Sequence, residues 1–368
     1  MSDATLKAPV LLKNAEEDNV ISMPGTACPL PIAHQEQIVL GHGSGGKLSA
    51  QLIESVFLPA FNNPMLNKLD DQAVLNINGS RLAFTTDAFV VTPLFFPGGN
   101  IGDLAINGTI NDLAMSGARP LYLAAAFILE EGLSTEELKR IVHSMSAAAK
   151  RAGVQLVAGD TKVVNRGKGD KIFISTTGIG VVERPVNISA DRALPGDKIL
   201  LSGYIGDHGM AILSQRENLE FEGVIESDCA PLHELVSDML DVSLDIHCLR
   251  DATRGGVATV LNEIACRSNA GMLLSETEIP VHDTVRGACE VLGLDPMYVA
   301  NEGKLIAVVP AKVADAVLEK MRTNPLGRDA RMIGEVVAAH AGMVLMQTEI
   351  GGTRVVDTLF GEQLPRIC

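Results

Sequence analysis

From residue 37 onward, short apolar segments that look like strands alternate with segments patterned like helices. Residues 82–86 and 172–175 are two of the strand-like segments, and residues 305–309 form a third, which a helical pattern over 311–322 follows. Such alternation is typical of proteins in which helices cover the faces of a sheet. The predicted fold class is therefore α/β, in the broad sense that includes α+β arrangements.

One helix is well marked in the first half. Ser134 and Glu137 have the spacing of a capping box, and an apolar stripe follows at Leu138, Ile141, Val142, Met145 and Ala149. Gly153 ends the pattern, and residues 154–157 then read as a buried strand that runs into Gly159-Asp160-Thr161-Lys162. Another helix is predicted from Gly255 to Cys266, and a strand is expected over residues 37–40.

A chain of 368 residues exceeds what a single hydrophobic core usually serves, so two domains are expected. Pro185 and the Pro195-Gly196-Asp197 turn favour a boundary near residue 185. The predicted organisation is a loosely ordered extension (1–36), an ATP-binding and dimerisation domain (37–184), a second α/β domain (185–350) and a mobile tail (351–368).

Charge and composition argue against several classes of protein. The net charge is −15, aromatic residues make up 4% and Trp is absent, so the basic patch and stacking platforms of a nucleic-acid-binding protein are missing. The apolar runs are far shorter than a membrane span, and the N-terminus lacks a secretory pattern. The six cysteines form no C-x-x-C pair. We therefore expect a cytoplasmic protein that binds neither nucleic acid nor membrane.

A glycine-rich loop spans residues 41–47. Gly41 and Gly46-Lys47 have the spacing of a Walker A loop, but Leu48 stands where such a loop needs Ser or Thr to hold magnesium. The remaining possibilities are another kind of anion-binding loop, in which Gly43, Ser44, Gly45 and Gly46 offer backbone N–H groups to phosphate, or a plain flexible turn.

Acidic residues recur at predicted strand ends and turns. The series is Asp70-Asp71, Asp87, Asn111-Asp112, Asp160-Thr161 and Asp251 with Thr253. A nucleotide enzyme without a P-loop must hold magnesium with carboxylates from dispersed segments, because hard divalent cations take oxygen ligands. Each single Asp is more often a helix cap or turn residue, so only the joint occurrence points to Mg²⁺ and a nucleotide.

Two further residues stand out. Glu302 precedes a glycine at a strand edge, where a solvated turn is more frequent than a catalytic group. Cys368 ends the sequence, which excludes a prenylation signal. It is either accidental or the reactive end of the stiff, semi-apolar Leu364-Pro365-Arg366-Ile367 segment.

Taken together, six motifs resemble the HypE family of hydrogenase-maturation carbamoyl dehydratases, which belong to the PurM-like (aminoimidazole-ribotide-synthetase-like) superfamily. The resemblance runs from about residue 37 to residue 368. The motifs are His42-Gly43-Ser44-Gly45-Gly46, the Phe96–Gly102 segment, Gly159-Asp160-Thr161-Lys162, the Arg250–Gly256 segment, Asn301-Glu302-Gly303-Lys304 and Pro365-Arg366-Ile367-Cys368.

The resemblance implies a two-domain PurM-like fold whose N-terminal sheet pairs with a second copy in a barrel-like homodimer interface. It implies that the carbamoyltransferase HypF loads Cys368, that the carboxamide is dehydrated to a thiocyanate with ATP, and that the cyano group passes to a HypC–HypD complex for the NiFe cofactor.

The resemblance also implies roles for individual residues. The expected magnesium ligands are Asp71, Asp87, Asp112 and Asp251. The expected nucleotide-binding residues are Gly43, Ser44, Gly45, Gly46, Asp87, Asn111, Asp112, Asp160, Thr161, Asp251 and Thr253. The expected catalytic residues are Cys368, Lys162 and Glu302.

Two alternatives remain open. One is another PurM-like enzyme, of the selenophosphate synthetase or thiamine-phosphate kinase type, for which the terminal thiol should be dispensable. The other is a non-catalytic carrier that only presents a thiol to its partners, and retained ATP hydrolysis would argue against it.

Overall fold

The computed structural model describes residues 37–219, 221, 223–361, 364 and 367–368. The predicted N-terminal extension (1–36) and Cys28 lie outside the described residues, as do Pro365 and Arg366. Contacts divide the chain into a unit of residues 1–38 and a unit of residues 39–368. The description below concerns the second unit.

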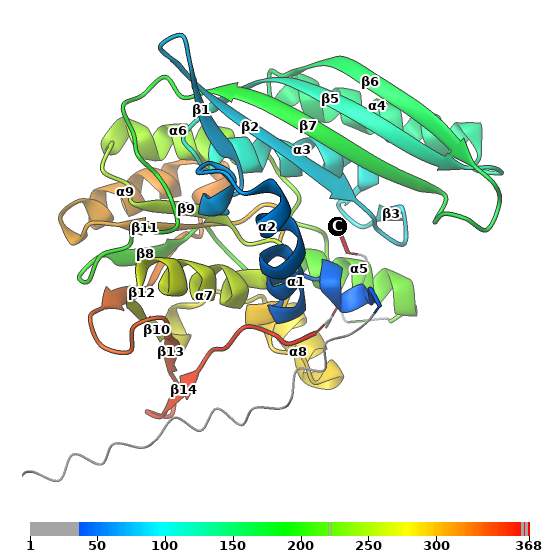
Figure 1. Cartoon of the computed structure of the whole chain (residues 1–368). Coiled ribbons are helices and arrows are strands. Elements are labelled where there is room, and N and C mark those ends of the chain that lie inside the picture. Colours follow the sequence, from blue (N-terminus) through cyan, green and yellow to red (C-terminus); the bar gives the residue numbers. More distant parts are fainter. Residues whose placement is uncertain (1–36, 220, 222, 362–363, 365–366) are drawn as a thin grey trace, which may run out of the picture. The chain divides into compact units, whose positions relative to one another are not determined.

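The first half of this unit contains a five-stranded sheet with one parallel pair, β5 and β6, while its other neighbours are antiparallel. In spatial order its strands are β1 (Ala73–Ile77), β2 (Ser80–Phe89), β7 (Ile172–Val181), β5 (Arg119–Glu130) and β6 (Gln155–Val164). Helices α3 (Ile101–Ala114) and α4 (Thr135–Arg151) pack together and against this sheet (Figure 1). The other face of this sheet carries exposed apolar side chains, among them Phe84, Tyr122 and Ile179.

The second half contains a seven-stranded sheet. In spatial order its strands are β14 (Thr353–Val355), β13 (Val344–Gln347), β10 (Gly271–Ser275), β12 (Arg331–Val337), β8 (Lys198–Leu201), β11 (Leu305–Val309) and β9 (Cys248–Asp251). Only β10 and β13 pair in parallel. A small hairpin, β3 (Phe95–Phe96) and β4 (Gly99–Asn100), precedes α3.

Both faces of the second sheet are covered, which explains why its central strands are apolar throughout. In β8, Ile199 and Leu201 join a core with α7 (Gly256–Ser268), whereas Leu200 joins a core with α6 (His233–Val242) and α9 (Ala311–Thr323). The second of these cores also contains Ala83 and Leu113 from the first half of the unit. The two halves therefore share one hydrophobic core.

The remaining helical segments are short or peripheral. The α-helices are α1 (Lys47–Leu52), α2 (Leu58–Phe61), α5 (Asp207–Glu217) and α8 (Asp283–Leu292), with a π-helical turn at Ile53–Phe57 and 3₁₀ turns at Leu40–Gly43, Leu66–Lys68, Glu276–Glu278, Pro296–Tyr298 and Pro325–Gly327. Within the described residues, none of the helices combines the length and the apolar character needed to cross a membrane.

Most elements predicted from the sequence are present, and three predictions are wrong. Residues 37–40 are not a strand, because Leu40 begins a 3₁₀ turn. In α4 the buried stripe contains Ile141 and Met145, but Val142 is exposed. Of residues 154–157, predicted to be a buried strand, Val154 is buried, but residues 155–157 belong to the exposed edge strand β6. An apolar run has the same pattern whether its strand is covered by its own chain or left open.

Candidate functional site

A cavity of about 400 Å³ collects most of the predicted acidic residues. Asp71 precedes β1, Asp87 lies in β2, Asp112 lies in α3 and Asp251 ends β9. The cavity is lined by Ile53, Asp70, Asp71, Thr86, Asp87, Ala88, Phe89, Gly108, Asp112, Asp251, Thr253, Arg254, Glu302 and Cys368. Segments from both halves of the unit therefore build a single site.

Three of these carboxylates form a group that fits a divalent cation. Oxygens of Asp71, Asp112 and Asp251 lie within 4.8 Å of one another. Thr85 Oγ1 donates to Asp112 at 2.8 Å, and Arg250 forms an ion pair with Asp71 at 2.9 Å. The Oδ2 atom of Asp71 is buried and has no hydrogen-bond partner, so an oxygen is available to a hard cation such as Mg²⁺.

Burial raises the pKa of all three carboxyl groups. For Asp112, desolvation is the main cause, and the neighbouring Asp251 and Asp87 raise the pKa further. For Asp71 the burial effect also outweighs the opposing charge of Arg250. The pKa of Asp251 rises to about 6 through burial, against the lowering effect of Arg250. A bound cation would relieve this strain between buried like charges.

The end of the chain enters the same cavity. The backbone N–H of Val90 donates to the main-chain oxygen of Cys368 at 2.9 Å, and Ile367 forms an antiparallel bridge with Val91. Cys368 lines the acidic cavity, and burial raises the pKa of its thiol to about 12 although Arg254 opposes that shift. The last residue is therefore docked beside the carboxylates, with its sulfur protonated.

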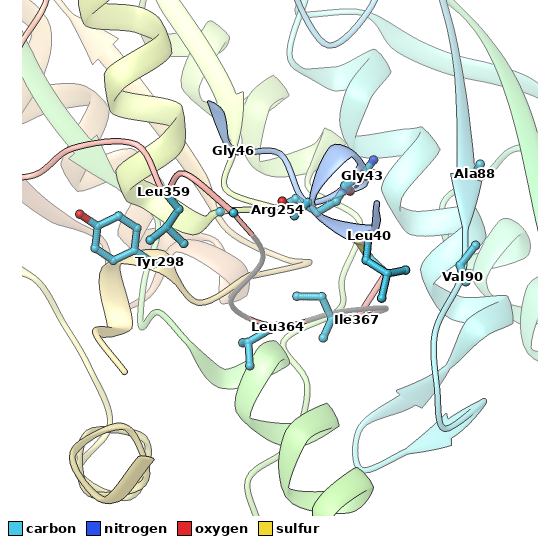
Figure 2. Close-up of a pocket in the computed structure, with 14 residues that line it drawn as sticks. Leu40, Gly43, Gly46, Ala88, Val90, Arg254, Tyr298, Leu359, Leu364 and Ile367 are labelled. Carbon is cyan, nitrogen blue, oxygen red and sulfur yellow. Dashed lines mark hydrogen bonds between the residues drawn. The ribbon is translucent and has the colours of Figure 1, made fainter. Parts of the chain in front are cut away.

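The glycine-rich loop lies in an adjoining pocket of about 290 Å³, which Cys368 also lines. Figure 2 shows Gly43, Gly46 and Arg254 on one side of this pocket and Val90 and Ala88 on the other. Arg254 donates to the Gly43 carbonyl at 3.2 Å. Gly45 has a φ of +80°, and a Cβ there would lie 2.9 Å from Arg254 Cβ, so the turn requires glycine. Gly43, Ser44 and Gly46 line the pocket, consistent with an anion-binding loop.

Glu302 projects from the loop before β11. It is 3% exposed, and its Oε1 atom is buried without a hydrogen-bond partner. Its backbone N–H donates to Asp228 at 2.9 Å, which fixes the loop. Burial, followed by the charges of Asp251 and Asp87, raises the pKa of Glu302. The residue is therefore a buried carboxyl in the cavity, not a solvated turn residue.

Asn111 and the Asp160–Lys162 segment lie elsewhere. Asn111 is buried, and its amide bonds to the backbone of Ala230, Leu232 and Glu302, so its side chain ties α3 to the second half of the chain. Asp160, Thr161 and Lys162 lie on the exposed edge strand β6, where Lys162 Nζ pairs with Asp160 at 2.7 Å. They line neither pocket of this single chain.

Arg254, within the Arg250–Gly256 segment, is a site residue to which the sequence motifs assigned no role. It lies 3.6 Å from Asp87, and its pKa is raised, first by the ionised form of Cys368 and further by the charge of Asp87. Its position in the Arg-Asp-Ala-Thr-Arg-Gly-Gly motif could have indicated a role in the site. A positively charged side chain among clustered acids can bind phosphate.

Comparisons with known proteins agree with this architecture. The models of the N-terminal and C-terminal domains of AIR synthase related proteins match residues 69–182 and 195–346. A protein named carbamoyl dehydratase HypE from Cupriavidus necator is 58% identical over 333 residues, which are 90% of this chain and 95% of the relative.

Two solved structures extend the comparison. One is the hydrogenase maturation protein HypE in complex with ATP, with 52% identity, a TM-score of 0.76 and coverage of 90% of this chain and 100% of that one. The other comes from a HypE–HypF complex, with 50% identity, a TM-score of 0.80 and coverage of 84% and 99%. The chain therefore belongs to the AIR synthase related family and, within it, to the carbamoyl dehydratases named HypE.

Proposed function

We propose that this protein uses ATP to dehydrate a carboxamide carried on the sulfur of Cys368, producing a thiocyanate that supplies the cyanide ligand of a NiFe hydrogenase cofactor. The observation that carries the proposal is the docking of the last residue in the cavity that holds the three clustered aspartates and Glu302. The thiol thereby lies in the same cavity as the acidic residues to which we assign the nucleotide, as the reaction requires.

The chemistry assigns a task to each group. An amide oxygen leaves poorly, so it attacks the γ-phosphorus of ATP and ADP departs. One N–H proton is then lost, the C–O bond breaks to release phosphate, and loss of the second N–H proton leaves the nitrile. Glu302 accepts a proton from the nitrogen, since its Oε1 is free and its raised pKa makes the ionised form a stronger base.

We place the nucleotide phosphates between the loop of Gly43, Ser44, Gly45 and Gly46 and the acidic cavity, with Thr253 and Arg254 beside them. Mg²⁺ held by Asp71, Asp112 and Asp251, with Asp87 nearby, would screen the charge that builds up on the phosphates. The buried oxygen of Asp71 that lacks a partner supports this assignment.

A homodimer would complete the site. Edge strand β6 is exposed along nearly its whole length and carries apolar side chains, including Val157 and Val163. Edge strands of this kind pair readily with another strand. We propose that a second copy docks here in a barrel-like interface and brings its Asp160, Thr161 and Lys162 to the nucleotide and carboxamide, because Lys162 is outside the cavity of its own chain.

The docked thiol cannot be the form that receives the carboxamide, because its raised pKa keeps it protonated. We therefore propose that HypF loads Cys368 while the tail is out of the cavity, and that a HypC–HypD complex later collects the cyano group. The cytoplasmic location and the domain boundary near residue 185 remain predictions.

The test uses the purified protein, HypF, carbamoyl phosphate and ATP, with the C-terminal peptide weighed by mass spectrometry. The peptide should gain one carbamoyl group and then lose one water, and Cys368→Ser should show no loss of water. A carbamoylated peptide that keeps its water in the presence of Mg²⁺ and ATP would overturn the proposal.

A further inference from the structure

His208 contacts the tail one residue before the bond from Val90. It lies in α5, is fully buried, and its Nε2 atom is 2.6 Å from the carbonyl oxygen of Ile367. Its Nδ1 atom is 2.8 Å from Ser227 Oγ, which also accepts the N–H of Cys229 at 3.2 Å. The described residues thus offer a continuous chain of hydrogen bonds from the tail into the body of the protein.

The hydrogen bonds assign the tautomer of His208. A carbonyl oxygen only accepts, so Nε2 must carry the hydrogen and donate it to Ile367. Nδ1 then accepts the hydroxyl hydrogen of Ser227, and the Ser227 oxygen remains free to accept from Cys229. A neutral imidazole satisfies all three bonds, and burial lowers the pKa of His208, which favours that neutral form.

The surroundings of His208 are firmly tied to the loop that carries Glu302. Gly209 donates to the Ala300 carbonyl at 3.1 Å, and Gly206 donates to Asn301 Oδ1 at 2.8 Å. The His208 ring also meets the ring of Phe96 edge to face, with centroids 5.6 Å apart. The donor that receives the tail therefore belongs to the same rigid piece as Glu302.

We propose that His208 is a positioning residue that sets how far the last residue enters the cavity. Its bond to the Ile367 carbonyl and the bond from Val90 to the main-chain oxygen of Cys368 hold two consecutive residues of the tail from the two halves of the unit. The sulfur of Cys368, with its carboxamide, is thereby held in register with Glu302. This inference rests on the proposed function only for its effect on dehydration, because docking itself is independent of the reaction.

Docking is measured by the rate at which iodoacetamide alkylates Cys368, followed by mass spectrometry of the C-terminal peptide. Exposed Cys266 serves as the internal reference in the same sample. His208→Ala and His208→Leu should each raise the Cys368 rate about fivefold to tenfold relative to Cys266, because one hydrogen bond holding the tail is lost. His208→Gln offers an N–H near the position of Nε2 and should restore most of the protection.

A second measurement separates positioning from general damage. Single-turnover dehydration of carbamoylated protein should slow in His208→Leu and recover in His208→Gln, while loading of Cys368 by HypF should be as fast as in wild type or faster. His143→Ala, on the exposed side of α4, is the control and should change none of these rates. If the substitutions only damaged local packing, His208→Gln and His208→Leu would behave alike, and both loading and dehydration would slow.

The outcomes distinguish the two proposals. If wild-type protein is loaded but loses no water, the proposed function fails while the alkylation result still decides the role of His208. If dehydration proceeds and Cys368 alkylation is the same in wild type, His208→Leu and His208→Gln, the positioning role is wrong.

Discussion

Asp251 has the clearest balance of opposing electrostatic effects in the site. It is buried at the end of β9, where desolvation raises its pKa to about 6 and Arg250 lowers it. A carboxyl whose pKa is higher in the folded state binds its proton more tightly there than in the unfolded chain. Without a cation, ionised Asp251 therefore destabilises the fold as pH rises from about 4 through about 6.

Asp251→Asn should remove this penalty. In EDTA at pH 7.5, the free energy of unfolding of the variant should exceed that of wild type by on the order of 2–3 kcal/mol. At pH 4 the two proteins should be equally stable. Urea unfolding at several pH values measures the difference, and exposed Asp315→Asn is the control. With saturating Mg²⁺ the order should reverse, because only wild type keeps the full ligand set. A difference that does not vary between pH 4 and 7.5 would contradict the electrostatic explanation.

Among the elements, local patterns predicted the second half best. The strand at Leu305–Val309 and the helix that follows were found because a run of five buried apolar residues and a 3.6-residue stripe leave few alternatives. The strand β6 was misjudged because Leu156 and Val157 have the composition of a buried strand, and sequence pattern does not reveal whether the rest of the chain covers that strand.

Of the candidate site, too, only a part could be predicted from the sequence. Asp71, Asp112 and Asp251 were predicted because acidic residues in short polar motifs are visible locally, although Asp112 lies within α3 and not at a strand end or turn. Cys368 was predicted because of its position. The role of His208 was not predicted, because its partner Ile367 is 159 residues away and nothing in the local pattern of α5 indicates that contact. Contacts between residues so far apart in the sequence can be recognised only once the fold is known.

At the level of one strand, β6 provides a direct test of the proposed interface. Val157 is 61% exposed in the single chain, so Val157→Lys should change the free energy of unfolding of the monomer by less than about 0.5 kcal/mol. It should nevertheless convert a dimer to a monomer in size-exclusion chromatography with light scattering. Val291→Lys, at an 81% exposed position of α8, is the matched control and should leave the dimer intact.

In the whole molecule, the site depends on the shared core that joins the two halves. Ala83 and Leu113 from the first half pack with Leu200 and Leu249 from the second, so the carboxylates of both halves are held at fixed separation. Desolvation of Asp112 and Asp251 follows from this closure, and so does the shelter from water that a dehydration needs. Neither half alone contains all three clustered aspartates, Asp71, Asp112 and Asp251.

The same reasoning extends to the assembly of two chains. If each site uses Lys162 from the other subunit, then a heterodimer of Lys162→Ala and Glu302→Gln contains one site with both residues intact and one site with neither. Each variant alone should lose water from carbamoylated Cys368 at least about a hundredfold more slowly than wild type. The purified heterodimer, prepared with two affinity tags, should recover about half of the wild-type rate. A heterodimer as inactive as its parents would show that Lys162 does not act across the interface, and a Lys162→Ala homodimer with normal turnover would remove Lys162 from the mechanism.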